Sequence, residues 1–172
     1  MNRLEMIGRF LSEGRNMMMN LDSECFCKRL KDELTFHFLR HKDIRTLSDF
    51  LGCRQVPAGE VLWKQGDACE YLAFIASGRV EVSKSTEFPG KNVIVGIYGA
   101  GSIVGELCLL KDQPRAVNVA ALEATDLLIL SKENFEQLME QHPDVGARLL
   151  KGMLLTVSTR LDKAFERLTA VF

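Results

Sequence analysis

The chain has 172 residues, of which 47% are hydrophobic and 26% are charged, and its formal net charge is −1. This length predicts one domain with a sizeable core, and the balanced charge argues against a nucleic-acid partner held by overall charge. No uncharged apolar run approaches the length of a membrane span. Charged residues also interrupt the first residues, where a secretory signal needs an apolar stretch; they are Arg3, Glu5, Arg9 and Glu13.

Residues 1–48 are predicted to form an N-terminal helical segment. Leu30, Leu34 and Phe38 recur at helical spacing with charged residues between them. His37 and His41 lie four residues apart and could share a helix face as metal ligands. No third ligand accompanies them, so a solvated or capping role is the simpler interpretation.

Cysteine usage predicts reduced thiols in a cytoplasmic protein. The five cysteines are an odd number without the spacing of a disulfide scaffold; they are Cys25, Cys27, Cys53, Cys69 and Cys108. The pair at 25 and 27 could suggest metal ligation, but no second closely spaced pair follows it. We therefore expect core or surface thiols, and no metal or other cofactor.

Residues 49–130 change to a β pattern. Short runs rich in β-forming residues alternate with Gly, Pro or Asp turns every eight to twelve residues or so. The strand candidates are 71–77, 79–85, 92–98, 115–122 and 126–131, and Gly78 between the first two suggests a tight hairpin. Many short strands with regular turns indicate a mainly β fold of the sandwich, barrel or jelly-roll type.

Residues 131–172 are predicted to form two C-terminal helices. Ser131 followed by Asn134 is a cap signal, and Pro143 is expected near the start of the second helix. That helix carries an apolar seam with alternating spacings of three and four, made of Ala147, Leu150, Leu154, Val157, Leu161, Ala164, Leu168 and Val171. Apolar Leu149, Met153 and Leu155 lie off the seam. The helix therefore either packs on its own domain alone or also forms a homodimer, which we expect.

The segment Val104–Ala120 places two charges in apolar surroundings. Glu106 and Arg115 are nine residues apart, and such charges are costly to bury unless they are paired with each other or with a ligand. A short helical turn after Gly105 would offer free backbone amides, and an Arg fork beside them suits one phosphate. Glu106 could accept hydrogen bonds from sugar hydroxyls. These residues indicate a compact ligand with both a phosphate and a sugar.

The run Gly105-Glu106-Leu107-Cys108-Leu109-Leu110, followed by Pro114-Arg115-Ala116, resembles the phosphate-binding cassette of the cyclic nucleotide-binding domain family. The resemblance covers about residues 30–168 and includes "GD" at 66–67 and "SGRVEV" at 77–82. It implies a jelly-roll (double-stranded β-helix) barrel flanked by N-terminal helices and two C-terminal helices. It also implies a cyclic nucleotide-binding regulatory module in which the final helix is a lid.

The resemblance assigns a role to each cassette residue. Arg115 would pair with the cyclic phosphate and Glu106 with the ribose 2′-hydroxyl, while backbone amides near Leu107, Cys108 and Ala116 complete the cradle. Gly105 would let the ligand approach. Ala116 stands where cGMP-selective members often carry Thr, which favours cAMP over cGMP, and Val117 replaces a commoner small residue. "RLD" at 160–162 is similar to a lid-helix run of channel members that would place Arg160 against the purine; the alternative is a solvated arginine.

Three alternatives stay open. Glu106 and Arg115 could form a salt bridge in a domain that no longer binds ligand and acts as an interaction module. The chain could also be the sensor half of a transcription regulator, although no DNA reader is expected before its end at Phe172 and hence no direct nucleic-acid binding. An enzyme is the third alternative. Jelly-roll metalloenzymes place His ligands on strands, whereas His37, His41 and His142 all lie outside the β region, so no enzyme is expected.

Overall fold

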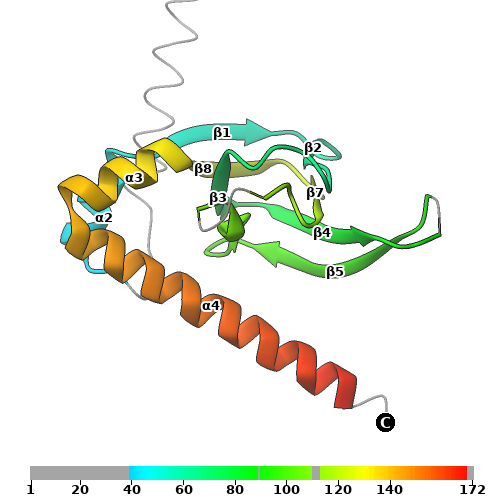
Figure 1. Cartoon of the computed structure of the whole chain (residues 1–172). Helices are drawn as coiled ribbons and strands as arrows, with labels where there is room; N and C mark the ends of the chain where they lie inside the picture. The colour runs from blue at the N-terminus through cyan, green and yellow to red at the C-terminus, as the bar shows by residue number, and fades with distance from the viewer. Residues whose placement is uncertain (1–38, 89, 110–112, 170–172) are drawn as a thin grey trace, which may run out of the picture. The chain divides into compact units, whose positions relative to one another are not determined.

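The computed structural model describes residues 39–88, 90–109 and 113–169, and most of the predicted N-terminal helical segment lies outside them. Within that segment the described part contains one helix, α2 (His41–Ser48). The strands follow, coloured from cyan to yellow in Figure 1: β1 (Gly52–Val56), β2 (Val61–Trp63), β3 (Tyr71–Ser77), β4 (Arg79–Ser85), β5 (Asn92–Gly99), β6 (Ile103–Val104), β7 (Asn118–Ala121) and β8 (Thr125–Ser131). A single 3₁₀ turn, η1 (Glu106–Leu109), separates β6 from β7, and the chain continues as α3 (Lys132–Gln141) and α4 (Pro143–Thr169).

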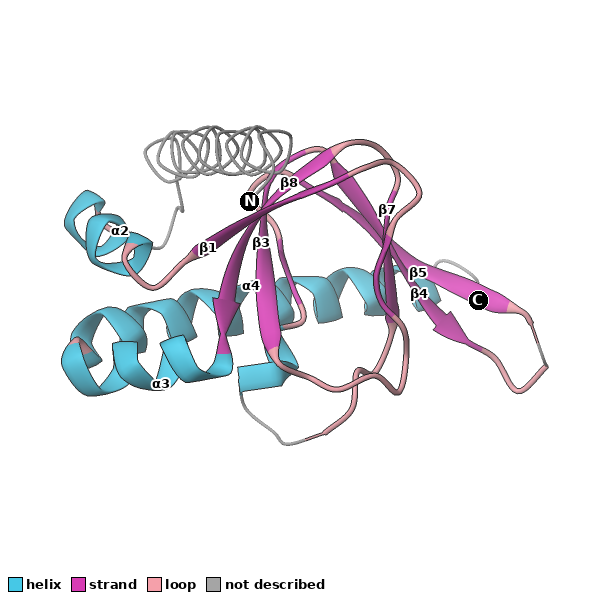
Figure 2. Cartoon of the chain, turned by 90° about the horizontal axis from the view of Figure 1, so that it is seen from above, coloured by secondary structure: helices cyan, strands magenta, loops and turns pink. Residues whose placement is uncertain are grey.

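The strands form two antiparallel four-stranded sheets with the orders β1-β8-β3-β6 and β2-β7-β4-β5. Figure 2 shows the two sheets crossing above α4. Apolar side chains from both sheets meet in one core, whose members are Val56, Leu62, Trp63, Ala73, Ile75, Val80, Val82, Val104, Val119, Ala121 and Leu127. The mainly β fold predicted from the turn spacing is confirmed, and so is the jelly-roll form that the resemblance implies.

The predicted hairpin at Gly78 is wrong. β3 pairs with β6 and β8, while β4 pairs with β5 and β7, so the chain passes from one sheet to the other at this glycine. Gly78 has φ 79°, and a Cβ there would lie 2.5 Å from the carbonyl oxygen of Ala124. The sequence contains the strand–Gly–strand pattern of a hairpin, but strand pairing is decided by partners far along the chain.

The C-terminal helices agree with their predicted signals. The Ser131 hydroxyl accepts a hydrogen bond from the amide of Asn134, 3.1 Å away, which confirms the cap of α3. Pro143 is the first residue of α4, a position where its missing N–H is not needed. Leu149 and Met153, which lie off the apolar seam, are buried against the rest of the domain.

The strand predicted over 115–122 begins later, at Asn118. Arg115 therefore does not open a strand. Its backbone is bonded to the loop between β2 and β3: the Arg115 amide donates to the carbonyl of Asp67 at 2.9 Å, and the Arg115 carbonyl accepts from Gly66 at 2.8 Å. These bonds replace the regular ladder bonds at this point, so the strand starts only after them.

The expectation of reduced thiols is wrong for all three described cysteines, because Cys53 is also disulfide-bonded. Cys69, in the loop before β3, and Cys108, in η1, form a disulfide with a Cα–Cα distance of 5.2 Å. The two cysteines are 39 residues apart and share no local sequence pattern, so the number of cysteines does not predict that they pair. In the described residues, no helix combines the length and the apolar character needed to cross a membrane.

Candidate functional site

Arg115 is a charged residue whose side chain lies inside the domain. The residue is 4% exposed. The guanidinium carbon lies 3.8 Å from the centre of the Trp63 ring and 4.7 Å from that of Tyr71. The two rings meet edge to face, with centroids 5.5 Å apart. Cation–π contacts with both rings therefore fix the guanidinium in place without using its N–H donors.

Two of those donors, Nε and Nη1, are buried and have no hydrogen-bond partner among the described residues. Burial lowers the pKa of the Arg115 guanidinium from its ordinary value, and the nearby Tyr71, Glu70 and Asp67 only partly offset this. A buried charge without hydrogen bonds is costly, so an arginine in this state is suited to receive an anion. A phosphate would supply both the opposite charge and two acceptors.

Gly105 lies directly against this guanidinium. It has φ 79°, a conformation that side chains rarely adopt. A Cβ on Gly105 would lie 2.7 Å from Nη1 of Arg115 and 3.2 Å from the Trp63 ring. The glycine thus permits both the turn from β6 into η1 and the close approach of Arg115 to the first residues of the cassette. The structure brings Gly105 and Arg115 together from opposite ends of the segment.

Glu106 does not pair with Arg115. Its carboxylate oxygen lies 3.4 Å from Nη1 of Arg160, and Nη2 of Arg160 donates to the carbonyl of Ile103. The guanidinium of Arg160 also lies 4.2 Å from the centre of the Tyr98 ring. Both alternatives from the sequence, a Glu106–Arg115 salt bridge and a solvated Arg160, are therefore wrong for this structure. Arg160 instead connects α4 to the start of the cassette.

The other cassette residues surround this arrangement. Leu107 and Ala116 are exposed, Cys108 is fully buried, and Val117 is half-buried against the core. The Cys108 amide already donates to the carbonyl of Gly105 at 3.1 Å. The segment between η1 and Arg115 includes residues 110–112, which lie outside the described ranges.

Sequence reasoning missed the aromatic residues of the site: Trp63, Tyr71 and Tyr98. Their positions in strands suggest ordinary core residues, and only the fold shows that each supports a guanidinium. Tyr71 is itself held in place, since Arg54 donates to its hydroxyl at 3.2 Å and forms an ion pair with Glu60 at 2.7 Å. The "GD" turn at 66–67, noted in the sequence, was the one available signal for the loop that holds Arg115.

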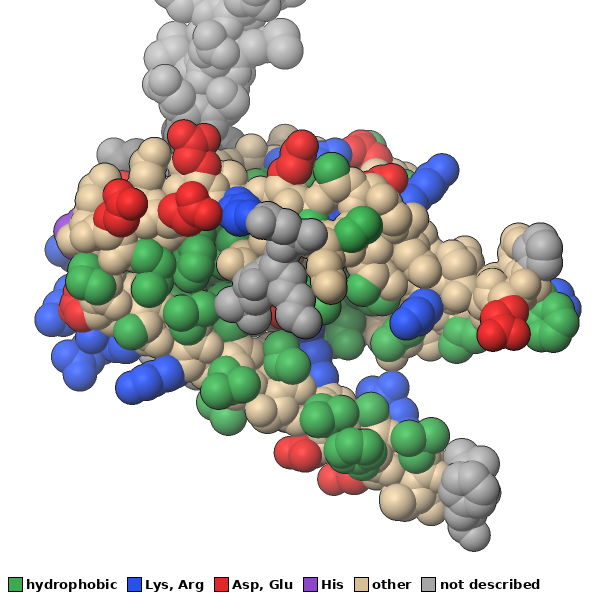
Figure 3. Space-filling model, viewed as in Figure 1, with side chains coloured by type: hydrophobic (Ala, Val, Ile, Leu, Met, Phe, Trp, Pro, Cys, Tyr) green, Lys and Arg blue, Asp and Glu red, His purple; other side chains and the backbone are tan. Residues whose placement is uncertain are grey.

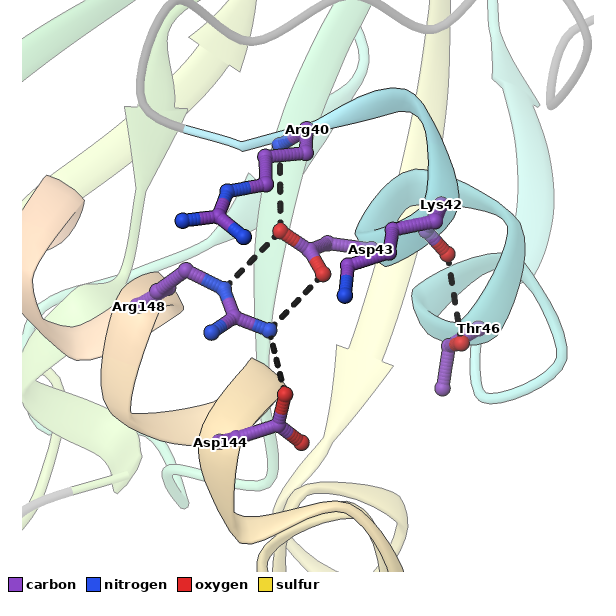
Figure 4. Close-up of polar contacts among 6 residues, drawn as sticks. All are labelled: Arg40, Lys42, Asp43, Thr46, Asp144 and Arg148. Carbon is purple, nitrogen blue, oxygen red and sulfur yellow. Dashed lines mark hydrogen bonds and ion pairs between the residues drawn. The ribbon is translucent and has the colours of Figure 1, made fainter.

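The first turn of α4 is fixed by a second polar cluster, shown in Figure 4. Arg148 donates to both carboxylate oxygens of Asp43 at 2.8 Å and to Asp144 at 2.6 Å. Asp43 is 1% exposed and also accepts from the amide of Arg40 at 3.1 Å. These bonds tie the base of α4 to α2, so the helix that carries Arg160 has a fixed point at its start.

The histidines make no metal site in the described residues, which contain no group of three or more His, Cys, Asp or Glu side chains that could hold a metal ion. His142 ends α3 and packs edge-on against the ring of Phe50, with centroids 6.1 Å apart. His41 begins α2, and His37 lies outside the described residues.

Comparison with known proteins gives a family for this arrangement. The family model of the cyclic nucleotide-binding domain matches residues 53–142. The cyclic AMP receptor protein of Thermus thermophilus is 29% identical over 136 residues, which are 77% of this chain and 62% of that protein. A lysophospholipase NTE1 of Phaeosphaeria nodorum is 33% identical over 97 residues, 56% of this chain but 6% of the enzyme. The chain thus spans less than two thirds of the length of either relative.

Among solved structures, a cyclic nucleotide-binding domain from Methylobacillus flagellatus is 26% identical and has a TM-score of 0.71. The match covers 87% of this chain and 84% of that one. The match includes residues outside the two sheets, because the strands make up less of the chain than the 87% that is covered. The comparison therefore agrees with the fold built above from both sheets and the flanking helices.

Proposed function

Because this chain belongs to the cyclic nucleotide-binding domain family, we propose that it is a regulatory module that binds cAMP and responds by changing the contacts of α4. The observation that carries the proposal is the buried, unpartnered guanidinium of Arg115. The phosphate would take its Nε and Nη1 donors, and Glu106 would accept from the ribose hydroxyl. No residue of this site makes or breaks a covalent bond in the proposal.

The contact between Arg160 and Glu106 supplies the link to α4. A ligand can change the position of a helix only if it binds the two positions unequally. A ribose hydroxyl on Glu106 would compete with Arg160 for the same carboxylate, which now lies 3.4 Å from Nη1 of Arg160. Nucleotide binding would therefore rearrange the Arg160 contacts and, with them, the C-terminal half of α4. In that arrangement Arg160 would be free to lie against the purine.

The test of this proposal is a pair of calorimetric titrations, with cAMP and with cGMP. Ala116 lacks the hydroxyl that cGMP-selective relatives place at this point, so we expect cAMP to bind about fivefold more tightly or better. The Ala116→Thr variant should narrow the difference by improving cGMP binding. If neither nucleotide binds at micromolar protein concentration, the module does not sense cyclic nucleotides, and the interaction-module alternative would replace this proposal.

We further propose that α4 pairs with α4 of a second copy. Leu154, Leu161 and Leu168 are 68%, 52% and 59% exposed, although they form the seam predicted from the sequence. Hydrophobic side chains gather along the C-terminal half of α4 in Figure 3. Leu149 and Met153 face the domain instead, so the two apolar faces of the helix have different partners. We place this dimer in the cytoplasm and without direct contact to nucleic acid.

The proposed dimer can be tested by measuring the size of the protein in solution. Leu161→Glu should shift the protein from dimer to monomer in sedimentation velocity, because it places a charge in the middle of the seam. Leu161 is exposed in the single chain, so the domain of the variant should still fold. Thr159→Glu is the matched control, since Thr159 is exposed on another side of α4. A parent protein that sediments as a monomer at 50 µM or so, well above common dimer affinities, would contradict the pairing.

A further inference from the structure

The Cys69–Cys108 disulfide joins the two parts of the candidate site. Cys108 lies in η1, two residues after Glu106, and is fully buried. Cys69 lies in the loop before β3, between Asp67, whose carbonyl holds the amide of Arg115, and Tyr71, whose ring supports its guanidinium. One covalent bond therefore connects the turn that presents Glu106 with the loop that positions Arg115.

The other restraints on η1 are noncovalent, and they include the ion pair of Glu106 with Arg160 at 3.4 Å. η1 is a single 3₁₀ turn, in which the Cys108 amide donates to the carbonyl of Gly105 at 3.1 Å. It packs against β3 and α3, with Leu109 as its other buried side chain. A turn of this length has little stability of its own. The disulfide is thus the strongest connection between η1 and the loop that carries Arg115's partners.

We propose that Cys69–Cys108 is a thiol–disulfide modification site, and that its reduction by a dithiol weakens nucleotide binding by loosening η1. The inference rests on the proposed function for its ligand. In a cytoplasmic protein, where we place this chain, disulfides that form are commonly catalytic or redox-sensing. The oxidised form is the one in which the cassette is preorganised, and preorganisation raises affinity.

The chemistry is ordinary thiol–disulfide exchange. Cys69 is half-buried whereas Cys108 is fully buried, so the incoming thiolate attacks the sulfur of Cys69. The Cys69–Cys108 bond breaks, and Cys108 leaves as a thiolate that takes up a proton. The second thiol of the reductant then attacks the mixed disulfide and releases Cys69 as a thiol. Two electrons and two protons pass from the dithiol, which becomes a disulfide, to the protein.

The experiment compares the full chain before and after treatment with dithiothreitol. Peptide mass spectrometry first locates the Cys69–Cys108 bond. Hydrogen exchange then reports on residues 105–109, and fluorescence titration with a labelled cAMP gives the affinity. We expect faster exchange in 105–109 and a loss of affinity of about fivefold or more upon reduction. Cys69→Ala should have the affinity of the reduced protein under both conditions, and the neighbouring Ala68→Ser should keep the parent's full response.

Three results would contradict the proposal. The proposal fails if the oxidised protein lacks the bond, or if exchange and affinity stay unchanged when the bond is cut. It also fails if Cys69→Ala still responds to dithiothreitol, because another cysteine, such as the disulfide-bonded Cys53, would then be responsible. If no nucleotide binds in either state but exchange in 105–109 rises on reduction, the proposed function is overturned, while the loosening of η1 by reduction is supported.

Discussion

Arg115→Ala is expected to weaken cAMP binding at least tenfold in isothermal calorimetry. The parent side chain offers Nε and Nη1 without any partner among the described residues, and a phosphate would accept both bonds. A charge-assisted hydrogen bond contributes about 1.5–3 kcal/mol, and more when water is excluded. Arg115→Lys should lose most of the affinity too, because an ammonium cannot reproduce the planar fork or the stacking on Trp63.

Two further variants separate binding from folding. Arg115→Met keeps an unbranched chain over Trp63 and removes a buried, unpaired charge, so its free energy of unfolding should equal or exceed the parent's while cAMP binding is lost. Arg79→Ala is the control for a general loss of positive charge, because Arg79 is exposed and pairs with Glu123 at 3.0 Å. Unchanged affinity in Arg115→Ala would remove the basis of the proposed function.

Asp43→Ala is expected to lower the free energy of unfolding by about 3 kcal/mol, since breaking a buried ion pair leaves the partner charge uncompensated. Arg148 would lose two bonds of 2.8 Å, and the amide of Arg40 would lose its acceptor. Asp144 would remain as a partner of Arg148, which places the loss at the low end for such pairs. Urea denaturation followed by circular dichroism measures the change. Glu123→Gln, in the exposed pair with Arg79, should leave the midpoint unchanged.

The pH dependence of Asp43 gives an independent check. Burial by itself would raise the pKa of Asp43, but the hydrogen bonds from Arg148 and the Arg40 amide outweigh it and hold the pKa below the ordinary value of 3.8. The ionised carboxylate therefore stabilises the fold above about pH 4, and that stabilisation is lost as the pH falls through the folded-state pKa. The stability gap between the parent and Asp43→Asn should shrink over this acid range. A gap that is constant from pH 7 to 3 would show that the charge of Asp43 is not its source.

The strands were largely predictable because their information is local. Turn residues bound each strand, and each strand is rich in β-forming residues, so the ranges 71–77, 79–85 and 126–131 are predicted closely. Pairing is not local. Ser77-Gly78-Arg79 has the composition of a hairpin, but β3 finds its partners in β6 and β8. Nothing near Gly78 specifies those partners.

The sequence predicts the charged residues of the cassette, but it does not predict the residues that hold them in place. The cassette motif identified Glu106 and Arg115, and the structure places Gly105 against the Arg115 guanidinium. The partner of Glu106 is Arg160, 54 residues away, and no motif links the two. Trp63 and Tyr71 were not recognised, because an aromatic residue on the inner face of a strand has the same sequence pattern whether it covers apolar groups or a cation.

The pairing of β1 with β8 has a consequence for how the protein is made. Gly52 lies opposite Ile129 and Val56 opposite Thr125. During synthesis β1 therefore leaves the ribosome well before β8, the strand it pairs with. At synthesis rates of about 5–20 residues per second, the interval is roughly 4–15 s. During that time β1 has an unpaired edge, and long-range pairings of this kind also fold slowly. Until Ser131 has been synthesised, β1 therefore lacks the strand it pairs with, and wrong edge pairing is most favoured in this interval.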